Sequence, residues 1–225
     1  MSFFDKYKAI FFDWDGTLVD SCDLILDAHN VVRKHFDKPL WTMDDFLGRA
    51  SESAREYYPK VYGDDSDTAQ KILYDFVEKH HLNYLEVMDS AFDLVRDLDV
   101  SCVVVSNKRH QILEKEIDHL QVANLLDCIV GAGVAKKDKP SSDPLLLGMK
   151  EVNPDLTPNN ILYVGDTETD LLCAKNTGCD VVLIQSNKAR PDLIEKYQPI
   201  LSFMTIKEFY SFYKEQKPVK SSQIA

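Results

Sequence analysis

Two carboxylates stand two residues apart directly after a short apolar run. The run is Ala9–Phe12, and Asp13, Asp15 and Gly16 follow it. Because side chains alternate along an extended segment, Asp13 and Asp15 should point the same way, and Gly16 allows a sharp turn after them. One carboxylate could attack a phosphorus atom while the other transfers a proton to the leaving oxygen. A strand that ends in acidic turn residues would have the same sequence, so the pair alone does not decide the function.

A second polar cluster follows another apolar run. Ser106 and Asn107 come directly after Cys102–Val105. A hydroxyl and an amide at this place suit hydrogen bonding to a phosphoryl oxygen, although either group could equally cap the next helix. Lys139 lies in the charged stretch 136–139, and most such stretches are only solvated surface.

A third cluster contains two further carboxylates, Asp166 and Asp170, after the apolar run Ile161–Val164. Carboxylate oxygens are the hard ligands that Mg²⁺ prefers, while Thr167 or Thr169 could simply cap a following helix. Three predicted strands therefore end in groups able to bind phosphate or metal. In open α/β sheets ligands bind at the carboxyl ends of the strands, so this shared position argues against a chance agreement.

The elements that must position these groups are short buried strands that alternate with helices. The predicted strands are Ala9–Phe12, Cys102–Val105, Cys128–Val130, Ile161–Val164 and Val181–Ile184. Repeated strand-then-helix order predicts an α/β fold, a Rossmann-like open parallel sheet with helices on both faces. Residues 21–87 show helical spacing only. We therefore expect an α/β core of residues 1–20 and 88–225, with a small all-helical cap, residues 21–87, inserted after the first strand.

Composition limits the partners and the cell compartment. The formal net charge of −11 argues against nucleic-acid binding. Five scattered cysteines without a CxxC pair indicate reduced thiols, and we see neither a secretory signal nor an apolar run long enough to span a membrane. We expect a cytoplasmic protein, a monomer or small homo-oligomer, without a membrane or nucleic-acid partner. Because the chain is so acidic, it can bind an anionic substrate only if a metal ion and well-placed lysines make the site locally positive.

Taken in order, the motifs resemble the haloacid dehalogenase-like (HAD) superfamily of phosphotransferases. The family pattern appears as Asp13-Trp14-Asp15-Gly16-Thr17, Ser106, Lys139 and Gly165-Asp166 with Asp170. The resemblance covers about residues 9–184, and the helical insertion resembles the cap of phosphoglycolate phosphatase-like members. It implies a Mg²⁺-dependent phosphatase that hydrolyses a small phosphorylated metabolite through an aspartyl-phosphate.

The resemblance also implies roles for five residues. Asp13 would be the nucleophile and a Mg²⁺ ligand, and Asp15 the general acid and base, with its backbone carbonyl on the metal. Ser106 would hydrogen-bond the transferring phosphoryl group. Lys139 would hold the charges of the nucleophile and the phosphate together, and Asp166 would bind Mg²⁺ directly.

Three further residues receive supporting roles. Asp170 would bind the metal directly or through water, and Asn107 would complete the phosphate cradle. Arg49, in the predicted cap, could meet a second anionic group of the substrate or form a surface salt bridge.

Other functions within and outside this family stay open. Asp15 argues against dehalogenase and phosphonate-cleaving members, which lack an acid at that position. A sugar-phosphate mutase would keep both aspartates, and a non-catalytic binding protein could share the fold. His80 and His81 have no matching metal ligands nearby in sequence, which favours packing or surface positions for them.

Overall fold

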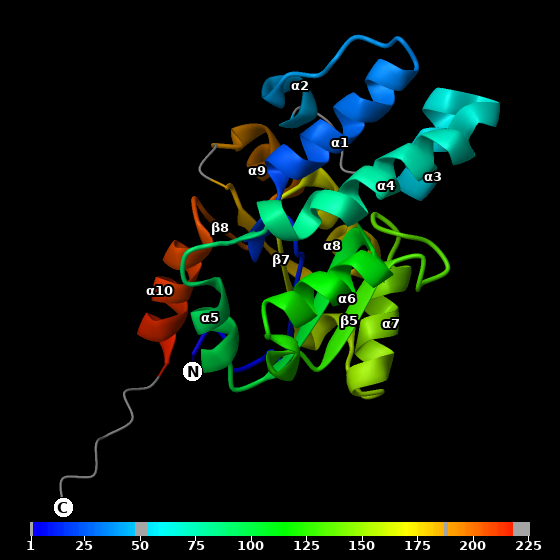
Figure 1. Cartoon of the computed structure of the whole chain (residues 1–225). Helices are drawn as coiled ribbons and strands as arrows, with labels where there is room; N and C mark the ends of the chain where they lie inside the picture. Colours follow the sequence, from blue (N-terminus) through cyan, green and yellow to red (C-terminus); the bar gives the residue numbers. More distant parts are fainter. Residues whose placement is uncertain (1, 48–53, 187–188, 218–225) are drawn as a thin grey trace, which may run out of the picture.

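A computed structural model describes residues 2–47, 54–186 and 189–217. Its centre is a six-stranded parallel sheet in the order β5-β4-β1-β6-β7-β8 (Figure 1). The strands are β1 (Ala9–Phe12), β4 (Ser101–Arg109), β5 (Cys128–Ala132), β6 (Ile161–Gly165), β7 (Asp180–Ile184) and β8 (Leu201–Phe203). All five predicted strands are present, and the predicted fold class is confirmed. The sixth strand, β8, was not predicted because its three residues are only half-buried and form no apolar run.

Helices cover both faces of this sheet, as predicted. Ile10 and Phe12 of β1 point to the face covered by α5 (Ala91–Asp97), α6 (His110–His119) and α10 (Ile206–Gln216). Ala9 and Phe11 point to the face covered by α7 (Asp143–Val152), α8 (Glu168–Thr177) and α9 (Pro191–Tyr197). Burial on both faces explains why the strands are uninterrupted apolar runs in the sequence.

Four helices gather beyond one end of the sheet, at the top of Figure 1: α1 (Cys22–His35), α2 (Met43–Leu47), α3 (Ala54–Tyr62) and α4 (Ser66–Tyr84). They have an apolar core of their own, in which Leu24 and Val32 of α1 meet Leu73 and Val77 of α4. Ile112 of α6 joins this core, so α4 rests on a helix of the sheet domain. This arrangement is that of a helical cap.

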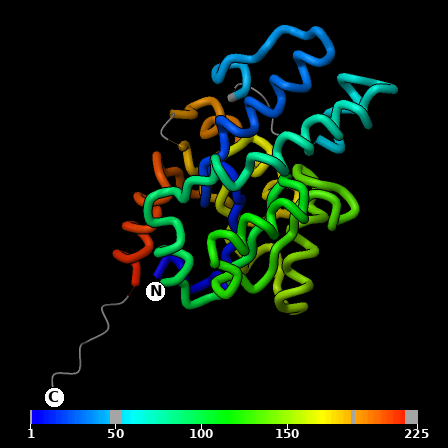
Figure 2. The backbone as a smooth tube through the Cα atoms, in the orientation of Figure 1, coloured from blue at the N-terminus to red at the C-terminus, as the bar shows by residue number. Residues whose placement is uncertain are grey.

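The chain passes into and out of these helices through a short antiparallel pair, β2 (Val19–Asp20) and β3 (Glu86–Val87). Figure 2 shows the chain rising from the sheet after β2 and returning before α5. The sequence predicted no strand within 21–87, and β3 corrects this, because a two-residue strand leaves no pattern. The exact division of the chain at 21 and 87 stays a prediction.

Three single-turn helices complete the described elements: η1 (Gly63–Asp65), η2 (Ala123–Leu125) and η3 (Pro158–Asn160). Among the described residues, no helix combines the length and the apolar character that crossing a membrane would require.

Candidate active site

The three polar clusters meet at the carboxyl edge of the sheet because their strands are neighbours. β1 lies between β4 and β6, and Phe12 pairs with both Val104 and Val164. Asp13 and Asp166, which follow β1 and β6, and Ser106, which lies in the last part of β4, line one cavity of about 490 Å³ between the sheet and the cap helices. The sequence motifs therefore form one site.

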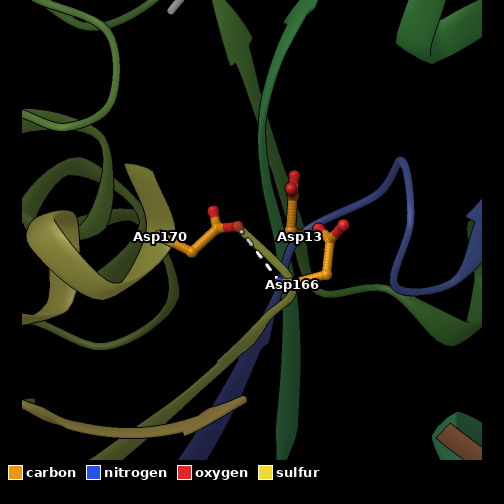
Figure 3. A group of neighbouring side chains, drawn as sticks. All are labelled: Asp13, Asp166 and Asp170. Carbon is orange, nitrogen blue, oxygen red and sulfur yellow. Dashed lines mark hydrogen bonds between the residues drawn. The ribbon is translucent and has the colours of Figure 1, made fainter. Parts of the chain in front are cut away.

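Asp13, Asp166 and Asp170 form a carboxylate cluster (Figure 3), and Asp13 and Asp166 also line the cavity. One oxygen from each lies within 4.8 Å of the others. Burial, followed by the charge of Asp170, raises the pKa of Asp13 to about 7. The same two causes raise the pKa of Asp166 well above its ordinary value. Hard oxygen donors whose mutual repulsion calls for a positive charge fit a divalent cation such as Mg²⁺.

Lys139 supplies a fixed positive charge beside this cluster. Its Nζ lies 2.8 Å from Oδ1 of Asp13 and 2.7 Å from Oδ1 of Asp170. Burial acts to lower the pKa of Lys139, but the charges of the two carboxylates outweigh it and the pKa is raised. Although Lys139 belongs to a charged stretch, it is 2% exposed, so the solvated-surface interpretation is wrong for this residue.

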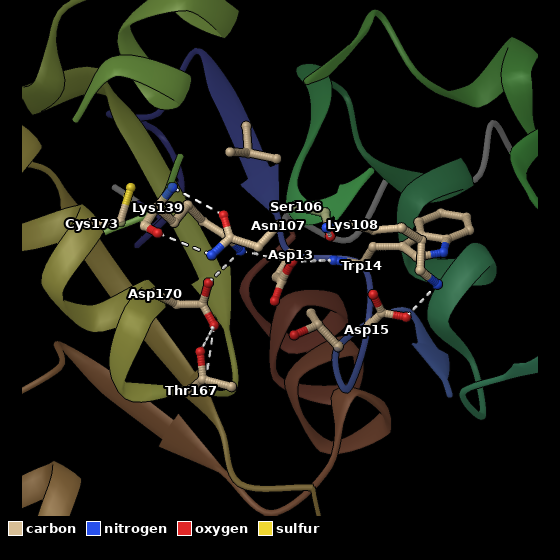
Figure 4. Close-up of polar contacts among 12 residues, drawn as sticks. Asp13, Trp14, Asp15, Ser106, Asn107, Lys108, Lys139, Thr167, Asp170 and Cys173 are labelled. Atoms are coloured by element: carbon tan, nitrogen blue, oxygen red, sulfur yellow. Dashed lines mark hydrogen bonds and ion pairs between the residues drawn. The ribbon is translucent and has the colours of Figure 1, made fainter. Parts of the chain in front are cut away.

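Two side chains hold Lys139 in place. Asn107 donates from Nδ2 to the Lys139 carbonyl and accepts the Lys139 amide at Oδ1, both at 3.0 Å. The hydroxyl of Tyr163 lies 3.0 Å from Nζ and 2.8 Å from Oδ1 of Asp170. These contacts make Asn107 and Tyr163 positioning residues for Lys139; Figure 4 shows the pair of hydrogen bonds between Asn107 and Lys139. Direct contact of Asn107 with a substrate stays a prediction.

Asp170 organises the start of α8 as well as Lys139. Its Oδ2 accepts hydrogen bonds from the amides of Asp166 at 3.2 Å and Thr167 at 3.0 Å, and from the Thr167 hydroxyl at 2.7 Å. Burial acts to raise the pKa of Asp170, yet Lys139 and these hydrogen bonds lower it overall. Thr167 is thus the N-cap of α8 that the alternative interpretation expected, and it lies directly beside the carboxylate cluster. The role of Asp170 as a metal ligand stays a prediction.

Asp15 is held by a different lysine. Its Oδ1 accepts hydrogen bonds from Nζ of Lys108 at 2.6 Å and from the hydroxyl of Ser21. Lys108 Nζ also lies 2.6 Å from Oε2 of Glu116, which is fully buried. Burial acts to lower the pKa of Lys108, but the charges of Asp15 and Glu116 outweigh it and raise the pKa.

Trp14 does not line the cavity, and Figure 4 shows its ring beside Lys108. Its Nε1 donates to Oε2 of Glu116 at 2.7 Å. Nδ1 of His81 lies 3.0 Å from the other carboxylate oxygen of Glu116, Oε1. His81 is therefore buried, as the packing interpretation expected, but it has a carboxylate partner 35 positions along the chain.

Sequence reasoning missed Lys108, Glu116, His81 and Tyr163. Of these, Lys108 alone carried a local signal, because it directly follows Ser106 and Asn107 at the end of β4. Ser106 lies where predicted, in the cavity wall, with its Oγ accepting the Lys108 amide at 3.1 Å. Arg49 lies outside the described residues.

Comparison with known proteins agrees with this geometry. A family model described as haloacid dehalogenase-like hydrolase matches residues 10–184. A phosphoglycolate phosphatase from Aquifex aeolicus is 26% identical over 200 residues, covering 82% of this chain and 90% of that protein. Pyrophosphatase PpaX from Bacillus mycoides is 22% identical over 197 residues, covering 86% and 91%.

A solved structure shares the fold. A haloacid dehalogenase-like hydrolase from Streptococcus pneumoniae superposes with a TM-score of 0.79 at 21% identity, covering 92% of this chain and 99% of that one. The predicted resemblance and the prediction of a hydrolase are both confirmed. With its motifs, its fold and its matched span in agreement, the chain belongs to the haloacid dehalogenase-like hydrolases.

Proposed function

We propose that this chain is a Mg²⁺-dependent phosphatase that hydrolyses a small phosphomonoester through an aspartyl-phosphate on Asp13. The observation that carries this proposal is the placement of the Asp13 carboxylate. It lines the cavity, 2.8 Å from the buried ammonium of Lys139 and within an acidic cluster suited to a cation. The phosphatase names of relatives that align over most of the chain support it.

The residues that would hold the metal are the carboxylates of Asp13 and Asp166 and the backbone carbonyl of Asp15, with Asp170 binding directly or through water. Bound Mg²⁺ would offset the negative charge of the carboxylates and of the phosphoryl oxygens.

The protein's own groups divide the remaining work. A carboxylate oxygen of Asp13 forms a bond to phosphorus as the ester P–O bond breaks, and Asp15 gives a proton to the departing oxygen. Asp15 then takes a proton from the water that hydrolyses the acyl-phosphate and regenerates Asp13. Lys139 and the Ser106 hydroxyl stabilise charge on the phosphoryl oxygens, which is where such reactions need it.

The substrate would be a small phosphorylated metabolite and the site of action the cytoplasm, in a monomer or small homo-oligomer. A sugar-phosphate mutase uses the same two aspartates. It would differ by depending on a sugar bisphosphate and by releasing phosphate only slowly.

Phosphate release from a panel of small esters, with Mg²⁺ and with EDTA, tests the proposal. Asp13→Asn should lower Mg²⁺-dependent release by more than about a thousandfold, because an amide is a very poor nucleophile. Asp155→Asn, at an exposed carboxylate ahead of β6, should leave it unchanged. Full activity of Asp13→Asn, or equal activity in EDTA, would rule the mechanism out.

A further inference from the structure

The cavity extends from the carboxylates deep into the cap. On α1 its wall is formed by Cys22, Ile25 and His29, which lie on one face of the helix because they are three and four residues apart. At 1.5 Å per residue these positions span about 10 Å. The cavity volume of about 490 Å³ is in the range of pockets that enclose whole organic ligands, about 300–1,000 Å³. A leaving group as small as glycolate would fill only part of it.

Aromatic rings surround the cap end of this cavity. The His29 ring centroid lies 5.1 Å from that of Trp41, and 6.2 Å from those of both Phe46 and Tyr57, and all four residues line the cavity. Leu73 and Val77 of α4 and Ile112 of α6 add aliphatic surface. Flat rings at these separations offer faces and edges to another ring.

Hydrogen bonds hold these rings in position. Asn30 of α1 accepts the Trp41 amide at 2.8 Å and donates to its carbonyl at 3.0 Å, and the Tyr58 hydroxyl lies 3.1 Å from Nδ1 of His29. The guanidinium of Arg33 lies over the Trp41 ring at 4.5 Å. The rings therefore do not have to be ordered by a ligand, which favours binding.

Charge is scarce on the same wall. Among the described residues of α1 to α4 that line the cavity, none is a lysine, an arginine or a carboxylate. The solvent-accessible cations that line the cavity, Arg109, Arg190 and Lys196, come from the sheet domain. A carboxylate or a second phosphate directed at the cap wall itself would therefore meet mostly apolar surface, which is unfavourable.

We propose that the substrate is a phosphomonoester whose leaving group carries a planar aromatic or heteroaromatic ring, bound among His29, Trp41, Phe46 and Tyr57. This inference rests on the proposed phosphatase function and names its substrate class.

A matched pair of alkyl esters tests it: 2-phenylethyl phosphate and ethyl phosphate, which break the same kind of bond and differ by the ring. The wild-type kcat/KM should be at least about tenfold higher for the ring-bearing ester. Trp41→Leu and Phe46→Leu should remove most of this preference, because they should lower kcat/KM for 2-phenylethyl phosphate more than for ethyl phosphate. Phe36→Leu, at an aromatic residue that packs in the cap but does not line the cavity, should preserve the preference.

Each outcome has a distinct meaning. Equal or higher kcat/KM for ethyl phosphate or phosphoglycolate overturns the substrate class while leaving the phosphatase intact. If no ester is hydrolysed, the proposed function fails, and binding of 2-phenylethyl phosphate, compared with ethyl phosphate by calorimetry, still decides whether the ring site exists.

A different observation concerns how Asp15 is held. Continuous buried polar contacts run from Asp15 through Lys108 and Glu116 to His81, with distances of 2.6, 2.6 and 3.0 Å. Asp15 lies just after β1, and Lys108 lies near the end of β4. Glu116 belongs to α6, and His81 belongs to the cap helix α4. Lys108, Glu116 and His81 have side chains at most 3% exposed. The contact between α4 and α6 is thus linked to the carboxylate assigned as proton donor.

The chemistry of each group fixes the direction of these contacts. Lys108 has donors only, so it bonds to both carboxylates as a cation. Oε2 of Glu116 accepts hydrogen bonds from Lys108 and from Trp14. Oε1 is also an acceptor, so Nδ1 of His81 must carry the hydrogen and donate it in the hydrogen bond between them. If α4 were displaced from α6, Oε1 would lose this donor, and a buried carboxylate with an unmet oxygen is unfavourable.

We infer that Lys108 and Glu116 are positioning residues for Asp15, and that His81 makes this positioning depend on docking of the cap helix α4. The inference rests on the proposed role of Asp15 as general acid.

The basicity of the leaving group provides the test. p-Nitrophenolate departs without protonation, whereas an alkoxide needs the proton of a well-placed acid. Glu116→Gln and His81→Phe should therefore lower kcat/KM for 2-phenylethyl phosphate at least about tenfold more than for p-nitrophenyl phosphate. Glu78→Gln breaks the exposed ion pair of α4 with Lys115 of α6, and as the control it should leave the ratio unchanged.

Trp14→Phe removes one donor to Glu116 but keeps an aromatic ring, so it serves as the milder variant should Glu116→Gln fail to fold. It should change the ratio in the same direction by a smaller factor. An equal loss on both esters in all three variants would overturn the inference, because a purely structural role predicts that pattern. Wild-type protein without phosphatase activity would overturn the proposed function instead.

Discussion

A Cβ atom on Gly16 would lie 2.2 Å from Oδ2 of Asp166. The turn after Asp13 therefore packs its backbone directly against a carboxylate of the cluster, and Gly16 also has a left-handed φ of +79°. Two demands meet at this position, namely a conformation that favours glycine and a close approach that only glycine permits.

Gly16→Ala should therefore displace the Asp166 carboxylate. We expect Mg²⁺ affinity and kcat/KM to fall by about tenfold to a hundredfold or more, measured by calorimetric titration of Mg²⁺ and by phosphate release. Gly178→Ala is the matched control, because Gly178 has φ +81° and nothing within 4 Å of its Cβ position. It should lose about 1–2 kcal/mol of stability from the strained backbone and keep its metal affinity. Equal Mg²⁺ affinity in the two variants would contradict the prediction.

Lys139→Met should damage both stability and activity. Its removal leaves the Asp13 and Asp170 carboxylates facing each other without the cation between them, and breaking a buried ion pair typically costs about 3–5 kcal/mol. Urea unfolding and phosphate release measure the two effects. Adding Asp170→Asn should recover part of the lost stability, since it removes one of the repelling charges. Lys137→Met, at an exposed lysine of the same charged stretch, should change neither quantity, and a loss comparable to that of Lys139→Met would contradict this interpretation.

Metal-free protein should lose stability as the pH rises from about 4 to about 7. Burial, followed by the charge of Asp170, raises the pKa of Asp13 to about 7 in the folded protein, whereas an unfolded aspartate titrates near pH 4. The folded state therefore binds the proton more tightly. Its contribution to stability is complete below about pH 4 and is lost as the pH approaches 7, with an upper limit of about 4 kcal/mol.

Thermal unfolding in EDTA at several pH values between 5 and 7.5 measures this loss, and Asp13→Asn should show a shallower decline, because its amide does not titrate. At pH 7.5, Mg²⁺ at a hundredfold excess over its Kd should stabilise the wild type by about 2.7 kcal/mol. The same Mg²⁺ concentration should stabilise it less at pH 5, where protons compete for the carboxylates. The same pH profile in wild type and Asp13→Asn would show that another group governs the loss.

Elements and site residues could be predicted from the sequence where they leave a local pattern of apolar and polar residues. The strands of the sheet are buried on both faces, so β1 and β6 are continuous apolar runs that can be recognised without a structure. Asp13 and Asp15 could be found for a similar reason, since they follow such a run at once. β8 and β3 are too short, and too exposed, to leave a pattern.

The partners of the site residues come from elements that contact one another only in the fold. Glu116 is an acidic residue in an amphipathic helix and would ordinarily be solvated, yet it is fully buried, with His81 of α4, Lys108 and Trp14 around its carboxylate. In the sequence Tyr163 cannot be told from any other aromatic residue of a core strand. Its hydroxyl contacts Lys139 only because the fold brings the loop that contains Lys139 next to β6. Such contacts depend on tertiary packing, which hydrophobic periodicity does not encode.

Tyr163→Phe tests whether that hydroxyl matters to the site. It removes the contact at 3.0 Å from Lys139 Nζ and the hydrogen bond at 2.8 Å to Asp170, while the buried ring stays. We expect a loss of about 1–2 kcal/mol in the free energy of unfolding. We also expect a decrease of about tenfold in kcat/KM, because Lys139 is held less firmly beside Asp13.

Tyr7→Phe is the control for this substitution. The Tyr7 hydroxyl also donates to a carboxylate, that of Asp180, at 2.8 Å, but it lies ahead of β1, at the opposite edge of the sheet from the site. It should lower the free energy of unfolding and leave kcat/KM unchanged. If both variants lowered kcat/KM by the same factor, the effect would come from general loosening of the sheet. A selective effect of Tyr163→Phe would instead show that Tyr163 positions Lys139 beside Asp13 for the proposed reaction.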